Sequence, residues 1–425
     1  MTSRSGRSFV LFLALSQFAT SGITAQEFLP AAPEKVGLSD DRLDRLTVAM
    51  QDYVDDGELA GAVVLIARRG SIAYLQSFGH RDIESDSPMT DDAAFRIASQ
   101  SKAIVSTGVM LLQEEGKLLI SDPVGRYLPE FAQTQVAVAR NDGGYDVIEA
   151  RGQVTIRQLL THTSGVSYGT GPASERWESA GIQGWYFADR KERVGDTIAR
   201  IAALPFDAHP GEQWIYGYNT DILGALIEVV SGRPLDEFLR TRIFEPLGMK
   251  NTHFYLPFDQ RDRLATVYSA TDSGLERAPN PGHMVGQGAY IDGPRTSFSG
   301  GAGLLSTAID YARFLQMMLN GGELEGTRLI SRKTVELMTT NHLTARQPFR
   351  PGQGFGLGFS IVENVGARGL PGSLGEFGWG GAYHSTYWVD PAEELVVVYL
   401  TQLIPAGGLN DHGRLRALIY QSIVD

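Results

Sequence analysis

The chain has 425 residues, a formal net charge of −12 and no cysteine. Its 43% hydrophobic and 20% charged residues predict a folded protein with a sizeable core. The lack of cysteine excludes disulfides, thiolate metal sites and a catalytic thiol, so a nucleophile must be Ser, Thr, Lys, a carboxylate or a metal-bound water. The dispersed excess of acids argues against nucleic acid or anionic lipid as a partner and favours a small molecule.

Residues 1–25 have the composition of a secretory signal peptide. Arg4 and Arg7 form a basic start, an apolar run covers 9–15, and small residues precede Gln26. The apolar run is much shorter than the ~20 residues that cross a bilayer. We therefore expect cleavage after Ala25, export to the periplasm or the exterior, and no membrane insertion of the mature chain. The alternative is a buried N-terminal helix.

Predicted elements follow in a definite order. An amphipathic helix is expected over 39–54, and a β-hairpin is expected from the apolar runs at 61–67 and 72–78. Helices are then expected over 99–115, 155–161, 194–204, 220–231 and 235–243. Strands return at 355–362, 385–389 and 395–400, and a helix follows over 414–423. Three stretches without clear periodicity are expected to be long loops: 136–153, 166–193 and 256–298.

The order of these elements predicts a discontinuous architecture. A two-stranded hairpin is too small a sheet to be stable alone, so we expect the N-terminal hairpin to join the C-terminal strands. The predicted fold class is α/β plus all-α, with an antiparallel sheet flanked by helices and a large helical insertion. We place the α/β domain at 26–98 and 290–425, and the mainly helical domain at 99–289.

The residues Ser99-Gln-Ser-Lys102 begin the predicted helix over 99–115. Residues three apart share a helix face, so the Lys102 amine comes beside the Ser99 hydroxyl. A serine hydroxyl needs a base, and a lysine serves as one when its amine is uncharged. The following residues 103–112 are nearly all apolar or small. This context favours a buried lysine with a catalytic role over an exposed pair on a solvated helix.

A second serine motif competes with Ser99. Residues 165–169 fit the pattern G-x-S-x-G around Ser167, and Asp390 and His412 follow in the Ser, Asp, His order of α/β-hydrolases. That fold needs a strand before the serine, whereas Ser167 follows the predicted helix over 155–161, so we favour Ser99. The eight histidines form no metal-binding motif. No metal or cofactor is expected, and His162 is expected to be a structural hydrogen-bonding residue.

Four separated motifs together resemble the serine β-lactamase and penicillin-binding-protein superfamily, and most closely the class C branch with the family VIII carboxylesterases. They are FRIASQSK at 95–102, LLTHTSG at 159–165, PGEQWIY at 210–216 with DILG at 221–224, and SGGAGLLS at 299–306. The resemblance implies a β-lactamase-like fold. It implies that Ser99 is the acylated nucleophile, that Lys102 is its proton partner, and that Tyr216 is the motif tyrosine that assists proton transfer.

Two departures from the family pattern concern the substrate. Tyr216 is followed by Gly217 and Tyr218, so the asparagine of the lactamase motif is missing at the third position. The Lys-Thr-Gly motif is replaced by Trp379-Gly380-Gly381, which removes a cation that pairs with a substrate carboxylate. The resemblance further implies an oxyanion hole formed by the backbone N–H groups of Ser99 and Ala382. We expect substrate binding by Trp379, Gly380, Gly381 and Tyr218. Trp379 as an ordinary core residue is the alternative.

These residues predict a serine carboxylesterase that cleaves short-chain or aryl carboxylic esters through an acyl-enzyme on Ser99. The expected partner is a small-molecule ester, bound in a cleft between the two domains that is lined by aromatic residues such as Tyr168, Trp185 or Tyr218. One alternative is a β-lactamase or DD-peptidase on the same scaffold. The other is a non-catalytic penicillin-recognising protein that keeps the fold.

Overall fold

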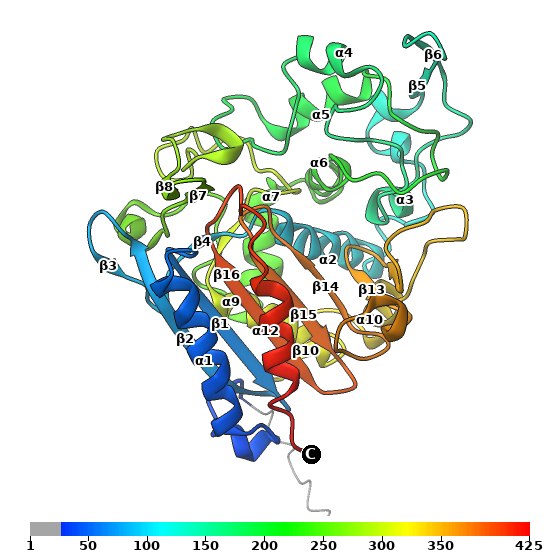
Figure 1. The fold of residues 1–425 in the computed structure, drawn as a ribbon. Helices are drawn as coiled ribbons and strands as arrows, with labels where there is room; N and C mark the ends of the chain where they lie inside the picture. Colours follow the sequence, from blue (N-terminus) through cyan, green and yellow to red (C-terminus); the bar gives the residue numbers. More distant parts are fainter. Residues whose placement is uncertain (1–26) are drawn as a thin grey trace, which may run out of the picture.

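The computed structural model describes residues 27–425, which fold around an eight-stranded antiparallel sheet (Figure 1). The strands follow the order β12-β13-β14-β15-β16-β1-β2-β3. Their bounds are β1 (Gly61–Arg68), β2 (Ser71–Asp82), β3 (Ser87–Pro88), β12 (Gln353–Phe355), β13 (Ser360–Val362), β14 (Phe377–Gly380), β15 (Thr386–Asp390) and β16 (Leu395–Thr401). The N-terminal hairpin therefore joins the C-terminal strands in one antiparallel sheet, as expected.

Two neighbouring inner strands, β1 and β16, are buried along their whole length. They pair from Ala62 opposite Thr401 to Arg68 opposite Leu395. Because side chains alternate across a strand, Val63 and Leu65 enter the core on one face of the sheet and Val64 enters the core on the other. Strands covered on both faces have continuous apolar sequences, as these two do.

Helices cover both faces of the sheet (Figure 1). The terminal helices α1 (Asp40–Asp55) and α12 (Asp411–Tyr420) lie on one face, where Leu43, Met50 and Leu415 pack against the sheet. Helices α2 (Ser101–Glu114) and α9 (Ala308–Leu319) pack on the opposite face. The other helices are α3 (Ile156–Leu160), α4 (Ser174–Ser179), α5 (Val194–Ala202), α6 (Asn219–Ser231), α7 (Leu235–Leu239), α8 (Glu245–Leu247), α10 (Arg332–Met338) and α11 (Val365–Arg368).

Short strand pairs and single helical turns complete the fold. The pairs are β4 (Phe95–Arg96) with β9 (Leu305–Ser306), β5 (Gln135–Ala139) with β6 (Tyr145–Glu149), β7 (Tyr268–Thr271) with β8 (Gly274–Arg277), and β10 (Glu323–Leu324) with β11 (Thr327–Arg328). The 3₁₀ turn η2 (Ala98–Gln100) joins β4 to α2. This turn carries Ser99.

The structure corrects several sequence expectations. The three expected loops contain the β5–β6 hairpin, helix α4 and the β7–β8 hairpin. Most side chains of β5, β6 and β8 are at least partly exposed, so these segments lack the apolar alternation that marks a strand. The single strand expected over 355–362 is two strands, β12 and β13, because the chain turns between them at Gly358, whose φ is 96°.

One further helix differs from its expected bounds, and the expected domain boundaries are not tested by the structure. The helix expected over 414–423 is α12, which begins at Asp411 and ends at Tyr420. The domain boundaries at 98/99 and 289/290 stay predictions. The predicted signal peptide over 1–25 lies outside the described residues. Within residues 27–425, no helix combines the length and apolarity needed to cross a membrane.

Candidate active site

Ser99 lies in the turn η2, immediately before α2, and its side chain is partly exposed. The preceding residue, Ala98, has a φ of 43°, in the left-handed region that a residue with a Cβ rarely adopts. The short β4–β9 ladder fixes the chain just before this point. Such backbone strain persists only where the surroundings impose it, and it often occurs at functional sites.

Lys102 occupies the first turn of α2 and is almost completely buried, with 2% of its surface exposed. Its Nζ donates to Ser99 Oγ at 3.2 Å, to Tyr168 OH at 3.2 Å and to the carbonyl oxygen of Gly301 at 2.7 Å. The amine makes no ion pair among residues 27–425. The expected Ser99–Lys102 pair is therefore assembled, with the amine in hydrogen-bonding reach of the hydroxyl.

Tyr216 lies against Lys102 in an unexpected way. Lys102 Nζ is 4.6 Å from the centre of the Tyr216 ring, and the Tyr216 hydroxyl accepts a 3.0 Å hydrogen bond from Trp379 Nε1. In the described chain, no hydrogen bond links this hydroxyl to Ser99 or Lys102. The ring is therefore placed beside the pair, and its hydroxyl is oriented by the indole.

Tyr168 is the tyrosine whose hydroxyl contacts Lys102 directly. Burial, followed by the neighbouring Tyr216 and Asp221, raises the pKa of Tyr168 well above its ordinary value, so the phenol stays protonated. Sequence reasoning placed Tyr168 only in the cleft lining and missed this contact. No spacing rule marks it, because Tyr168 lies in an irregular loop 66 residues beyond Lys102.

Trp379 and the glycines after it form the end of β14 and the turn that follows. Gly381 packs against the segment that precedes the nucleophile, because a Cβ at this position would come 2.6 Å from the carbonyl oxygen of Ile97. The next residue, Ala382, lies in the β14–β15 turn (residues 381–385) and is partly exposed. Its N–H donates to no other atom of residues 27–425. That N–H is free to bind a substrate oxygen.

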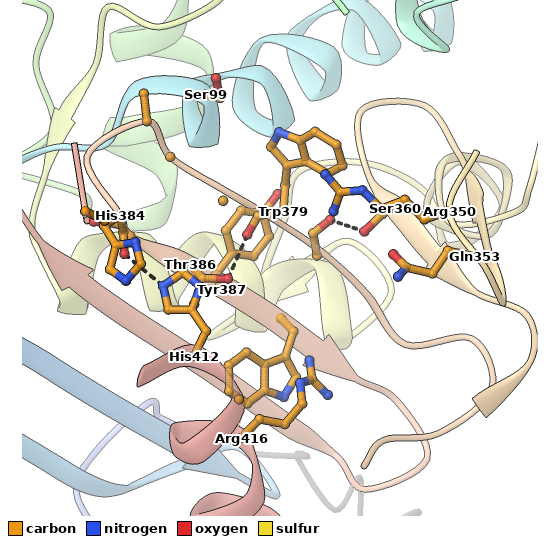
Figure 2. A pocket seen from close by; sticks show the side chains of 18 of the residues that line it. Ser99, Arg350, Gln353, Ser360, Trp379, His384, Thr386, Tyr387, His412 and Arg416 are labelled. Atoms are coloured by element: carbon orange, nitrogen blue, oxygen red, sulfur yellow. Dashed lines mark hydrogen bonds between the residues drawn. The ribbon is translucent and has the colours of Figure 1, made fainter. Parts of the chain in front are cut away.

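A cavity of about 640 Å³ opens onto Ser99 (Figure 2). Its lining combines the candidate nucleophile, aromatic side chains and the predicted oxyanion residue: Ser99, Tyr168, Trp185, Tyr216, Trp379 and Ala382, with Gly380 and Gly381 at the edge of β14. Arg350 also lines it, with its guanidinium carbon 5.0 Å from the centre of the Trp379 ring. Figure 2 shows Ser99 at one end and Arg416 with His412 at the other.

Tyr218 does not line this cavity. It is fully buried, stacks on Trp177 with ring centres 5.8 Å apart, and donates its hydroxyl to the carbonyl oxygen of Gly184 at 2.6 Å. Tyr168 lies between Tyr218 and the site, with ring centres 4.9 Å apart. The sequence-based assignment of Tyr218 to substrate binding is therefore corrected, because this side chain supports Tyr168 from behind.

The competing serine motif is not assembled. No hydrogen bond of the described chain joins Ser167, Asp390 and His412 to one another. Ser167 Oγ accepts from the Gly169 N–H at 3.1 Å, whereas Asp390 accepts from Tyr420 OH at 2.8 Å. The α/β-hydrolase alternative is therefore dropped.

His162 has the structural contacts expected of it. Burial, and then the charge of Lys102, lower the pKa of His162 well below its ordinary value, so the ring is neutral. Its Nδ1 accepts a 3.0 Å hydrogen bond from Asn219 Nδ2. Asn219, which stands one place too late for the lactamase motif, therefore holds His162 and lies away from the cavity lining.

A cluster of His384, Asp411 and His412 was missed at the sequence level, because its members are up to 28 residues apart. Their ligand atoms lie within 4.8 Å of one another. However, the two imidazoles stack with centres 4.2 Å apart and an angle of 21°, and His384 Nε2 is 2.6 Å from Asp411 Oδ1. A metal ion binds in the plane of an imidazole ring, and two nearly parallel stacked planes cannot share one ion. In this arrangement the cluster is a hydrogen-bonded pair with a stacked neighbour.

Comparisons with known proteins agree with this site and fold. Esterase EstB of Burkholderia gladioli is 32% identical over 373 residues, which cover 84% of this chain and 89% of the esterase. A putative D-alanyl-D-alanine carboxypeptidase of Escherichia coli K12 is 27% identical over 87% of this chain and 84% of its own length.

Among solved structures, EstCE1, a hydrolase with promiscuous acyltransferase activity, superimposes with a TM-score of 0.77 at 29% identity. The superposition covers 89% of this chain and 98% of that one. The model of the family described as Beta-lactamase matches residues 46–421. The chain is therefore a hydrolase with the serine β-lactamase fold and belongs to the beta-lactamase family.

Proposed function

We propose that this protein is a carboxylesterase that cleaves short-chain or aryl esters through an acyl-enzyme on Ser99. The observation that carries the proposal is the buried Lys102 amine, which donates to Ser99 Oγ at the end of an aromatic-lined cavity. A base within hydrogen-bond reach of a serine is the arrangement that activates the hydroxyl. The similarity to two proteins named as an esterase and a hydrolase supports the same reaction class.

In the proposed acylation step, the Lys102 amine acts as the base and takes the proton of Ser99 Oγ as this oxygen attacks the ester carbonyl carbon. The N–H groups of Ser99 and Ala382 donate to the oxyanion that forms. The C–O bond to the alcohol then breaks, and the alcohol takes the proton from Lys102 through the Tyr168 hydroxyl, which Lys102 contacts. In deacylation, water gives a proton to Lys102 along the same path as its oxygen attacks the acyl carbon. The bond from this carbon to Ser99 Oγ then breaks, Lys102 returns the proton to Ser99 Oγ, and the acid leaves.

One side chain of the cavity, at the position that corresponds to the family's Lys-Thr-Gly motif, favours an ester over a β-lactam as the substrate. Trp379 stands there, and its indole N–H already donates to Tyr216. An aromatic wall binds an acyl chain or an aryl group by burial of apolar surface. It supplies no charge to a substrate carboxylate.

One observation favours the second candidate, a DD-peptidase or β-lactamase. Arg350 lines the cavity and forms no ion pair within the described part of the chain. Its guanidinium is available to a substrate carboxylate, although it does not stand at the position of the family's motif lysine, which Trp379 occupies. The similarity to a protein named as a putative carboxypeptidase agrees with this candidate.

The test follows p-nitrophenol release from p-nitrophenyl butyrate, together with the mass of the peptide that contains Ser99. We expect a burst and a butyryl adduct on Ser99, and loss of both in Ser99→Ala. Ser167→Ala, in the competing motif, keeps the burst. Full activity of Ser99→Ala contradicts the proposal. A higher kcat/KM for nitrocefin than for the ester favours the second candidate, and no turnover of either identifies a non-catalytic binding protein.

We further propose that the protein is exported after removal of residues 1–25. The basic start, the apolar run and the small residues before Gln26 support this location. N-terminal sequencing of the protein recovered outside the cytoplasm tests it, and a mature chain that still begins at Met1 contradicts it.

A further inference from the structure

The β14–β15 turn carries Ala382, and the side chain two residues later ties this turn to helix α12. His384 Nε2 lies 2.6 Å from Asp411 Oδ1, in the first turn of α12. His384 has a φ of 64°, a left-handed conformation that is unfavourable for a histidine. A residue stays in this conformation when its contacts on several sides fix it.

Asp411 uses both of its carboxylate oxygens. Oδ1 accepts from His384 Nε2 and from the His412 N–H at 2.8 Å, and Oδ2 accepts from Tyr399 OH at 2.6 Å. The carboxylate is completely buried. Removing one of its partners leaves a charged oxygen with too few donors, which is costly in a buried place.

His412 completes the tie from the same helix. Its Nε2 donates to the carbonyl oxygen of His384 at 2.9 Å, and its ring stacks on the ring of His384. Both the side chain and the backbone of His384 are therefore held by α12. Since Ala382 is two residues away in the same turn, the position of its N–H depends on these contacts.

The opposite side of the turn packs against the segment that carries the nucleophile. Gly381 approaches the Ile97 carbonyl oxygen, and its N–H donates to the Ser385 carbonyl oxygen at 2.8 Å. Tyr383 is fully buried and packs edge-on against Trp185. The turn is therefore held between η2 and α12.

Ser99 and Ala382, the two expected oxyanion donors, come from separate segments of the chain. The distance between their N–H groups is set by how the β14–β15 turn sits against η2, and the contacts from α12 hold the turn in this place. We propose that His384 and Asp411 are positioning residues for the oxyanion hole, which keep the Ala382 N–H directed at the developing oxyanion. This inference rests on the proposed function.

Three variants test the role. His384→Leu removes the donor to Asp411, His384→Gln keeps an N–H donor at a similar reach, and Asp411→Asn removes the charge. We expect His384→Leu to lower kcat about tenfold or more, since loss of a whole oxyanion donor costs about 10²–10³-fold. KM for p-nitrophenyl butyrate stays within about twofold of wild type, because the ester carbonyl in the ground state gains little from this donor. His384→Gln recovers most of the rate, and Asp411→Asn is intermediate.

Asp310→Asn is the matched control. Asp310 is also a buried carboxylate in the first turn of a helix, α9, and accepts from the Asn251 N–H at 2.7 Å and from Thr252 Oγ1 at 3.0 Å. It does not line the cavity. We expect this variant to lower Tm while kcat per active site, counted from the burst, is unchanged.

A boronic acid inhibitor gives a second readout, because its tetrahedral adduct on Ser99 places an oxygen in the oxyanion hole. We expect its affinity to fall in His384→Leu by the same factor as kcat/KM. An unchanged kcat per active site and an unchanged inhibitor affinity in both His384→Leu and Asp411→Asn overturn the positioning role alone. A wild-type protein without a burst contradicts the proposed function, and the positioning role falls with it.

Discussion

Trp379 Nε1 donates a 3.0 Å hydrogen bond to the hydroxyl of Tyr216. The residue that we align with the family's motif lysine therefore contacts the residue that we align with its motif tyrosine. Trp214 also stacks on Tyr216, with ring centres 5.7 Å apart, but its indole N–H has no partner in the described chain. The two tryptophans offer a matched pair for testing what the hydrogen bond contributes.

Trp379→Phe keeps an aromatic wall and removes the N–H donor. Since one hydrogen bond is worth about 1 kcal/mol, we expect kcat for p-nitrophenyl butyrate to fall about fivefold through misorientation of the Tyr216 hydroxyl. Trp214→Phe, which removes no hydrogen bond, is expected to keep the rate of the wild type. Equal losses in steady-state kinetics of the two variants would show that only packing matters.

Lys102→Met replaces the buried amine by an apolar chain of similar length. We expect acylation to fall by about 10²–10⁴-fold, as for loss of a proton-transfer group. We expect the fold to be kept, because Met fills the same buried space and the Lys102 amine has no ion pair among residues 27–425. The measurement is the burst rate, with Tm as the check of folding and Lys117→Met, on the surface, as the control. A normal burst in Lys102→Met would remove this lysine from the mechanism.

Arg350→Gln separates the two candidate substrate classes. For an exposed guanidinium, an ion pair is worth up to about 1 kcal/mol, or about fivefold in kcat/KM. We expect this loss for the p-nitrophenyl monoester of succinate and no loss for p-nitrophenyl butyrate, which lacks the carboxylate. Arg346→Gln, in the same loop but outside the cavity lining, is the control. The same loss for both esters would argue against a carboxylate partner.

Arg277 links the β7–β8 hairpin to Asp82 and Glu84 at 2.7 Å each. Partial burial alone would raise the pKa of Asp82, but hydrogen bonds from Thr266 and Arg277 outweigh it and hold the pKa well below its ordinary value. A carboxylate with a lowered pKa stabilises the fold above its unfolded pKa of about 4, and this contribution is lost as the pH falls through the folded value.

Tm is therefore expected to fall as the pH drops from about 5 to about 3, and the fall should be smaller in Arg277→Met. Thermal unfolding across this pH range measures both slopes. Arg140→Met, which removes an exposed pairing with Asp142 and Asp146, is the control, and it is expected to change the slope less than Arg277→Met does. A steeper fall of Tm in Arg277→Met than in the wild type would contradict the stabilising effect of Arg277 on ionised Asp82.

The sequence was sufficient where chemistry follows spacing or continuous apolar runs. Ser99 and Lys102 meet because residues three apart share a helix face, and the sheet follows from the buried runs in β1 and β16. The hairpin β5–β6 was missed because it is mostly exposed. The clearest sequence indication of this hairpin was Gly143, a glycine that adopts a φ of 84° in the turn between the two strands.

The missed parts of the site depend on contacts between distant segments. Tyr168 reaches Lys102 from an irregular loop, and His384 meets Asp411 from a different element. Tyr218 shows the opposite error, since it was expected among the aromatic residues that line the cleft. At the start of α6, the ring of Tyr216 faces the cavity, whereas the ring of Tyr218 is buried against Trp177. No single-segment pattern contains such information.

The pairing of β1 with β16 also bears on how the protein is made. Ala62 has its partner at Thr401, near the other end of the chain, so β1 cannot complete its ladder until almost all of the polypeptide is present. Such distant pairing slows folding, because a long loop must close before any contact repays it. Until then an apolar strand edge stays open to aggregation. A chain truncated before β16 is therefore expected to be a substrate for proteases rather than a smaller working enzyme.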